Sequence, residues 1–398
     1  MTQTVLRVGI LSAGTQSIRH LYLPVLQTLD KSYHVVSLYD FAAATQTPRD
    51  SDAPPKLSKP VPASAPSPEA VLHDATIDLV INFMPNEFHE QYTVAALDAG
   101  KHVMVEIPVS LSIQSAKRIM DAEQRAPNNA KVFVACARRH APCFDTVFKK
   151  EVASLDRIYY ARCRNIAGPN TAHTATAPKR DWFATNGPRE SPNPDATKHP
   201  LATEGRRALT GLLQEAFRGQ DLTKARLALS HFLASLGCHD LGLMRDVFGE
   251  PDAISNITVN EPFYSILLHY DGRVSRGEYP FTLMYETGTD AVPRCDAHLA
   301  VYGNTKTVSM SYGLPYAWEQ PVRVVVETTD ENGELRRTET VSTCEETLQA
   351  ELRALHAFLV DGAAAKTTTA DALQDLRLFQ TIYDQYDRQC GTIRTPLG

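Results

Sequence analysis

The sequence predicts a two-domain protein, with a doubly wound parallel α/β sheet first and a larger, mainly antiparallel sheet with helices second. At 398 residues the chain exceeds the size at which one hydrophobic core stops growing. Short apolar strands alternate with helical patterns as far as residue 137, and longer strands replace them beyond residue 157. We therefore expect domains at 1–134 and 135–398, with an inserted segment at about 165–230.

Apolar runs and helical spacing alternate through the first part of the chain. Strands are predicted at 5–11, 34–39, 77–83, 102–105 and 132–137, and helices at 18–29, 87–99 and 113–124. Gly100 follows the second of these helices as a C-cap. Between Thr45 and Pro68, closely spaced prolines predict a long surface loop.

Longer strands indicate that the second domain is an α+β unit with a large open sheet. They are predicted at 157–164, 265–270, 281–285 and 297–302. The polar, proline-rich stretch 165–200 and the helices expected at 204–217 and 222–236 form the insertion, which is either a lid over a site or an oligomer contact. We expect the last helices, 346–360 and 370–387, to pack back on the body.

Composition indicates a globular protein of the cytoplasm. Hydrophobic residues at 43% and charged residues at 22% are ordinary globular values. A net charge of −6 offers phosphate backbones no basic field, so no nucleic-acid partner is expected. Neither an export signal nor an apolar run of about 18 residues is visible, which predicts no membrane partner. The seven cysteines lack paired spacing and indicate free thiols, with neither disulfides nor a metal site.

The residues after the first predicted strand are typical of a dinucleotide-binding turn, in which backbone amides at a helix N-terminus meet a pyrophosphate. The turn reads Ser12-Ala13-Gly14-Thr15-Gln16-Ser17, with Gly14 where the closest approach is needed. Ser12 and Ser17 stand where G-x-G-x-x-G has glycines. Asp40 ends the second strand, where a carboxylate accepts ribose hydroxyls and repels a 2′-phosphate. We expect a Rossmann-type domain that binds NAD rather than NADP, although Asp40 as a turn cap is the alternative.

Several separated stretches match the motifs of one family. Met84-Pro85-Asn86 with His89 resembles its TPN-x-x-H string, 99–102 (Ala-Gly-Lys-His) its AG-K-H string, and Glu106-Ile107-Pro108 its Glu-Lys-Pro tripeptide. Residues 237–240 (Gly-Cys-His-Asp) resemble the helix that opens its second domain. The chain thus resembles the glucose-fructose oxidoreductase and inositol dehydrogenase (Gfo/Idh/MocA) family, outside the proline loop and the insertion.

The resemblance implies that the carboxyl edge of the parallel sheet holds the nicotinamide ribose of NAD, with NADP as the second possibility. The contacts expected there are Met84, Pro85, Asn86, His89, Glu106, Ile107 and Pro108. For His89 the alternative is that it caps or packs its own helix.

The resemblance also implies where proton transfer takes place. The family uses the lysine of Glu-Lys-Pro with an Asp-x-x-x-His pair, whereas Ile107 and Ser235 occupy the lysine and aspartate positions here. His239 is kept, and its ordinary pKa suits an acid or base. Arg139 and Lys179 are further catalytic candidates, and Arg138, Trp182 and Asp240 are candidates for substrate contact. For each of the arginines, the lysine and the tryptophan, a surface charge or a packing aromatic is the alternative.

Three functions stay open at this point, because a fold does not choose among them. The first is an NAD(P)-dependent oxidoreductase acting on a small hydroxylated or carbonyl substrate, such as a sugar, polyol or cyclic metabolite. The second is a non-redox isomerase, lyase or cyclase, and the third a dinucleotide-binding regulator, since a fungal galactose-pathway repressor is similar to the family. Asp40 and the 84–86 rim favour a retained cofactor and thus the first. Similar proteins cover their open sheet by self-association, which predicts a homodimer or a multiple of one.

Overall fold

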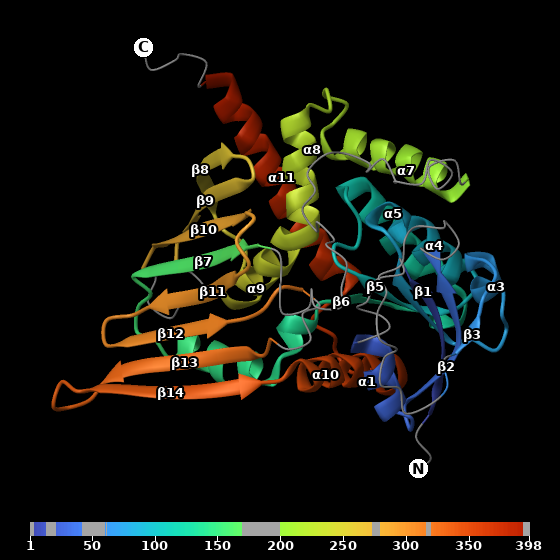
Figure 1. Ribbon diagram of the computed structural model, residues 1–398, viewed down its shortest axis with the longest axis horizontal. Coiled ribbons are helices and arrows are strands. Elements are labelled where there is room, and N and C mark those ends of the chain that lie inside the picture. Colours follow the sequence, from blue (N-terminus) through green and yellow to red (C-terminus); the bar gives the residue numbers. More distant parts are fainter. Residues whose placement is uncertain are drawn as a thin grey trace.

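Two sheets organise the molecule, one in each domain (Figure 1). The computed structural model describes residues 4–12, 21–41, 60, 62–168, 200–272, 279–315 and 320–392. The first sheet has the order β3-β2-β1-β4-β5-β6, and its described strands are all parallel. Its strands are β1 (Leu6–Ser12), β2 (Tyr33–Asp40), β3 (Ala63–Ser64), β4 (Leu79–Phe83), β5 (His102–Glu106) and β6 (Val132–Ala135). The predicted doubly wound parallel sheet is confirmed.

Helices cover both faces of this sheet, which is why β4 reads as a continuous apolar run and is buried throughout. One face carries α3 (Pro68–Leu72), α4 (His89–Asp98) and α5 (Ile113–Arg125). The other carries α1 (Leu23–Thr28) and α10 (Cys344–His356), which returns from the far end of the chain. Leu348, Leu352 and Leu355 of α10 join the apolar cluster of β1, so the expected return packing is confirmed.

The predicted proline loop is wrong at its C-terminal end. Ala63 and Ser64 add the edge strand β3 to β2. Pro68 opens α3 instead of closing a loop, because proline at the first helical position loses no hydrogen bond and Ser67 caps the helix. Residues 42–59 and 61, where the rest of the predicted loop falls, lie outside the described residues.

The second sheet has eight described strands in the order β14-β13-β12-β11-β7-β10-β9-β8, and only the pair β7 and β10 is parallel. They are β7 (Tyr160–Ala167), β8 (Ala253–Asn260), β9 (Phe263–Tyr270), β10 (Phe281–Thr289), β11 (Cys295–Tyr302), β12 (Lys306–Ser311), β13 (Val322–Thr329) and β14 (Leu335–Ser342). The mainly antiparallel sheet is confirmed. The sequence prediction did not include β8, β13 or β14, and the side chains of β14 are mostly exposed and therefore lack apolar alternation.

Helices of the second domain pack on one face of its sheet, except the helix 200–216, which lies against α5 of the first domain (Figure 1). They are α6 (Lys149–Ala153), α7 (Pro200–Ala216), α8 (Lys224–Phe232), α9 (Cys238–Phe248) and α11 (Thr369–Thr392). A π-helical turn, Leu233–Gly237, joins α8 to α9, so the helix predicted to end at 236 continues. In the described part of the chain, every helix is too short or too polar to cross a bilayer.

Candidate functional site

The carboxyl ends of the parallel strands meet along one edge of the first sheet. Ser12, at the end of β1, lies in register with Asp40 of β2 on one side and Phe83 of β4 on the other. The chain order reverses between β1 and β4, and ligands of doubly wound sheets bind at such a switch point. Asp40 is 9% exposed at this edge, where a ribose would lie. These residues fit a dinucleotide, while Gly14, Thr15 and Gln16 of the predicted turn lie outside the described residues.

His89 ties together the two loops that follow β4 and β5. Its Nδ1 is 2.8 Å from the carbonyl oxygen of Pro108 and its Nε2 is 2.9 Å from that of Met84. Burial lowers the pKa of His89, although the two carbonyl oxygens oppose this by favouring the charged ring. Because His89 is 0% exposed, the structure corrects the expected cofactor contact to the alternative, a packed histidine that shapes the rim.

Replacing His89 with alanine is expected to lower the free energy of unfolding by about 3 kcal/mol, because it opens a cavity and removes the group that bridges two buried carbonyls. Urea unfolding of the variant measures the change. The exposed His73 at the end of α3 is the matched control, with an expected loss below about 0.5 kcal/mol for His73→Ala. Equal losses in the two variants would contradict the bridging role.

Of the other predicted rim residues, Pro85, Asn86 and Ile107 differ in how far they are exposed. Pro85 and Asn86 are partly exposed at the start of a short 3-10 turn, Asn86–Phe88, where they remain proposed cofactor contacts. Ile107 is 6% exposed and belongs to the hydrophobic core. Asn82, which the sequence analysis missed, is fully buried and donates to Thr93 Oγ1 at 3.1 Å and to the carbonyl of His89. It fixes the start of α4 under the rim.

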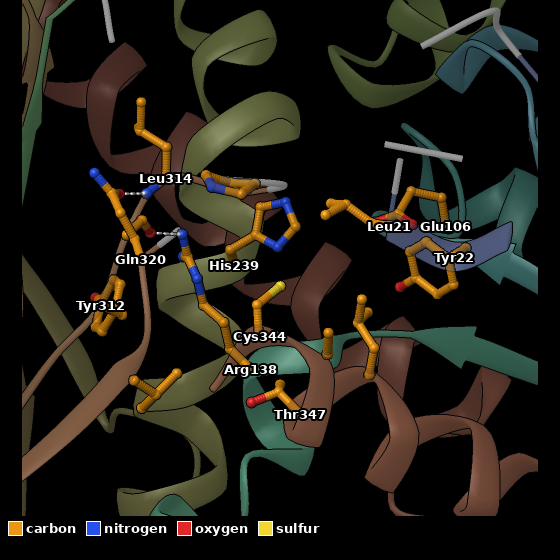
Figure 2. Close-up of a pocket in the computed structure, with 15 residues that line it drawn as sticks. Leu21, Tyr22, Glu106, Arg138, His239, Tyr312, Leu314, Gln320, Cys344 and Thr347 are labelled. Atoms are coloured by element: carbon orange, nitrogen blue, oxygen red, sulfur yellow. Dashed lines mark hydrogen bonds between the residues drawn. The ribbon is translucent and has the colours of Figure 1, made fainter. Parts of the chain in front are cut away.

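A pocket of about 70 Å³ lies between the two domains (Figure 2). The dinucleotide domain contributes Glu106 from the end of β5 and Tyr22 from the start of α1, and Arg138 follows β6. The second domain contributes His239 of α9 and the segment 312–315 after β12. Cys344, Thr347 and Leu348 of α10 complete one wall. Figure 2 draws His239 between Arg138 on one side and Glu106 with Tyr22 on the other.

Arg138 is a fixed cation in the pocket wall. Its guanidinium donates to the carbonyl oxygen of Gly313, lies 4.5 Å above the ring of Tyr312, and is 3.5 Å from Asp240. The side chain is only 10% exposed. Held from three sides, Arg138 presents its remaining N–H groups in a defined direction.

Asp240 lies beneath the pocket and supports Arg138. Its carboxylate accepts hydrogen bonds from Tyr285 and Tyr312, each at 3.0 Å, and from Asn165 at 2.9 Å. Burial raises the pKa of Asp240, while Arg138 and these donors act in the opposite direction. Because Asp240 is 0% exposed, the structure corrects its expected substrate contact to a supporting one. The sequence analysis missed these three donors, which come from β7, from β10 and from the residue after β12.

His239 is the titratable group that faces both Arg138 and the rim. It is 8% exposed, and burial together with the positive charge of Arg138 lowers its pKa well below the ordinary value. Its imidazole is therefore neutral at pH 7. A neutral imidazole accepts a proton, so the chemistry of this position is that of a base.

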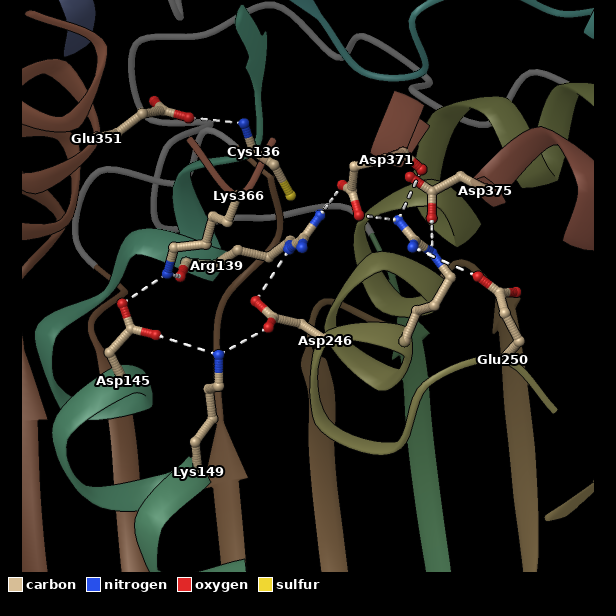
Figure 3. Close-up of polar contacts among 11 residues, drawn as sticks. Cys136, Arg139, Asp145, Lys149, Asp246, Glu250, Glu351, Lys366, Asp371 and Asp375 are labelled. Atoms are coloured by element: carbon tan, nitrogen blue, oxygen red, sulfur yellow. Dashed lines mark hydrogen bonds and ion pairs between the residues drawn. The ribbon is translucent and has the colours of Figure 1, made fainter. Parts of the chain in front are cut away.

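Arg139 points away from the pocket into a cluster of ion pairs (Figure 3). It bonds Asp246 of α9 at 3.0 Å and also Asp371 of α11. Burial lowers the pKa of Arg139, but Cys136 and these carboxylates outweigh burial and raise it. Arg245 bonds the same Asp371 at 2.8 Å. Its contacts correct the predicted catalytic role to a structural one. Lys179 and Trp182, the predicted site residues of the insertion, lie outside the described residues.

Comparison with known proteins agrees with this geometry. Residues 6–135 match the model of the oxidoreductase family with a NAD-binding Rossmann fold. Inositol 2-dehydrogenase of Paracoccus denitrificans is 34% identical over 88 residues, which are 22% of this chain and 26% of that protein. The same enzyme of Corynebacterium glutamicum is 28% identical over 144 residues, 36% of this chain and 40% of that protein. The aligned parts thus span less than half the length of these curated relatives.

Solved structures resemble nearly the whole chain in fold. A NAD binding oxidoreductase from Klebsiella pneumoniae has a TM-score of 0.64 at 15% identity, covering 97% of this chain and 98% of that one. A variant of a 3-ketoreductase from Actinomadura kijaniata, in complex with TDP-benzene and NADP, has a TM-score of 0.64 at 14% identity, covering 96% and 98%. The strand order, the motifs of the rim and the match over 6–135 lead to one conclusion: the first domain of this chain is similar to the oxidoreductase family with a NAD-binding Rossmann fold.

Proposed function

We propose that this chain is an NAD(P)-dependent oxidoreductase that acts on a small hydroxylated or carbonyl substrate. The observation that supports it most is the convergence of Glu106, Arg138 and His239, from three different elements, on one pocket at the carboxyl edge of the parallel sheet. Relatives named for inositol and for 1,5-anhydro-D-fructose favour a polyol, a sugar or a cyclic ketone as substrate.

In the proposed reaction, each of the pocket residues has a separate role. When bound, a nicotinamide takes a hydride from an alcohol carbon or gives one to a carbonyl carbon. Neutral His239 accepts the hydroxyl proton as the alcohol is oxidised, and returns it in the reverse direction. Arg138 donates to the substrate oxygen and stabilises the negative charge that develops there. Ile107 carries no proton, so the proton passes through His239 rather than through a lysine at this position.

Binding and turnover test the proposal together. NADH and NADPH are titrated into the purified chain and followed by fluorescence, and polyols, sugars and the corresponding ketones are then screened by the change in nicotinamide absorbance. We expect saturable binding and turnover with at least one substrate. Binding without turnover on all substrates would favour the dinucleotide-binding regulator or the non-redox enzyme. Ile107 and Ser235, which replace the usual lysine and aspartate, also favour these two alternatives.

Asp40 is expected to set the preference for NAD. Replacing it with serine removes the acceptor for the ribose hydroxyls and should weaken NADH binding about tenfold, while NADPH binding improves because no carboxylate repels the 2′-phosphate. Fluorescence titration of both cofactors measures the ratio. Asp98→Ser, at an exposed position of α4, is the matched control and should leave both affinities unchanged. Unchanged NADH affinity in Asp40→Ser would remove Asp40 from the cofactor site.

We also propose that the outer face of the second sheet is covered in a homodimer or a multiple of one. Tyr160 and Tyr302 stack on this face with ring centroids 6.0 Å apart and are 36% and 38% exposed. Exposed aromatic side chains on an open sheet are typical of a contact between subunits.

A further inference from the structure

Glu351 is a buried carboxylate that reaches two separate parts of the pocket wall. It lies in α10 and is 0% exposed. One oxygen accepts from the hydroxyl of Tyr22 at 2.8 Å, and the other accepts from the backbone N–H of Cys136 at 2.6 Å (Figure 3 shows the second contact). Among the described residues, burial and the bonds from Tyr22 and Cys136 are what acts on this carboxylate, and no lysine, arginine or histidine is paired with it. Burying a carboxylate without a cation is costly, so its presence here points to a role beyond packing.

The two donors belong to the parts of the site that a ligand needs in place. Tyr22 lines the pocket, follows the predicted dinucleotide turn, and packs edge-on against Phe83 with centroids 4.8 Å apart. Cys136 begins the segment that carries Ala137 and Arg138, which also line the pocket. Glu351 itself lies one turn beyond Thr347 on α10, directly behind the wall that Thr347 and its neighbours form.

We propose that Glu351 is a positioning residue, whose ionised carboxylate holds Tyr22 and the Arg138 segment in place and whose protonation loosens both. The role goes beyond the proposed function, and depends on it only for the identity of the ligand. A charge-assisted hydrogen bond is roughly twice as strong as a neutral one, so adding a proton weakens both contacts without changing the shape of the side chain.

The surroundings of Glu351 place its titration in the physiological range. Burial raises the pKa of Glu351 to about 7, against the opposing effect of the bonds from Tyr22 and Cys136. The other titratable groups that interact with it are Tyr33 of β2 and Cys344 of its own helix, with the Cys136 thiol on the third side. Burial keeps all of these neutral near pH 7, because it raises the pKa of each. Glu351 is thus the group of this set that changes charge between pH 6 and 8.

Glu351→Gln imitates the protonated form and gives the decisive comparison. In the ligand-free, isotope-labelled chain, the amide NMR signals of Ala137 and Arg138 are expected to shift with a midpoint near pH 7 in the wild type and to lose this shift in Glu351→Gln. The dissociation constant of NADH should rise about fivefold from pH 8 to pH 6 in the wild type and stay constant within about twofold in the variant. Glu123→Gln is the matched control, because Glu123 also accepts from a backbone N–H, that of Val132, and from the hydroxyl of Thr369, yet lies away from the pocket. It should keep the wild-type profile.

A second variant keeps the proposal testable if Glu351→Gln does not fold. Tyr22→Phe removes a donor that lowers the pKa of Glu351, so the NMR midpoint should move to higher pH. The proposal would be overturned if the amide NMR signals of Ala137 and Arg138 did not shift as Glu351 titrates. It would also be overturned if Tyr22→Phe left the pH midpoint of that shift unchanged. If the wild type bound neither NADH nor NADPH at any pH, the proposed function would be contradicted instead. The ligand-free NMR result would still decide the role of Glu351.

Discussion

Substituting alanine for His239 is expected to lower the rate of alcohol oxidation by a factor of about 10² to 10⁴ while leaving dinucleotide affinity nearly unchanged. In the proposed function the imidazole is the base at the pocket, and Ile107 offers no replacement for it. Alanine removes the proton acceptor but leaves Asp40 and the carboxyl edge of the parallel sheet intact. The measurement is the rate of NAD reduction at saturating cofactor, together with the dissociation constant of NADH.

The pH profile distinguishes this role from simple damage to the pocket. Because burial and Arg138 hold the pKa of His239 well below 6.5, its neutral form dominates above that pH. In the Glu351→Gln background, where the proposed titration of Glu351 does not contribute, the rate at saturating cofactor should therefore be flat from pH 6.5 to 8 and fall only in more acidic solution. His231→Ala, at an exposed position of α8, is the control and should keep the wild-type rate. Full activity of His239→Ala would refute the assignment of His239 as the base.

Replacing Asp240 with alanine is expected to lower the free energy of unfolding by about 3–5 kcal/mol. The change leaves the buried charge of Arg138 without its carboxylate and removes the acceptor for Tyr285, Tyr312 and Asn165. Urea unfolding gives the value, and kinetics on the folded fraction should show a higher KM as well, because Arg138 loses a support.

Asp98→Ala supplies the matched comparison for Asp240. The Asp98 side chain is 56% exposed and its ion pair with Arg125 is 4.0 Å long, so its loss should cost less than about 0.5 kcal/mol. A loss below about 1 kcal/mol in Asp240→Ala would show that Arg138 and the two tyrosines find other partners, and would reject the supporting role.

Local signals in the sequence were sufficient for most of the first domain. The buried strands β1, β4 and β5 appear as apolar runs, and Gly100 has a φ of +71°, the left-handed conformation expected at a helix C-cap. The proline-rich segment before α3 led to the wrong prediction of a loop, because proline, which breaks a helix in its interior, can also begin one. In each case the outcome depends on residues close to one another in the chain.

The roles of the polar site residues depend instead on partners far away in the sequence. Arg138 and Arg139 are neighbours with the same chemistry, yet a short turn aims the first at the pocket and the second at Asp246 and Asp371. Glu351 is separated from Cys136 by 215 residues, and no local pattern connects them. Tertiary packing determines these roles. The sequence therefore identified the candidate residues but not the role of each one.

A crystal structure with bound NADH tests the central claim most directly. The account predicts adenosine ribose density beside Asp40 and the nicotinamide ring in the pocket lined by Glu106, Arg138 and His239. Density for the dinucleotide at another place, or a nicotinamide ring outside this pocket, would contradict it.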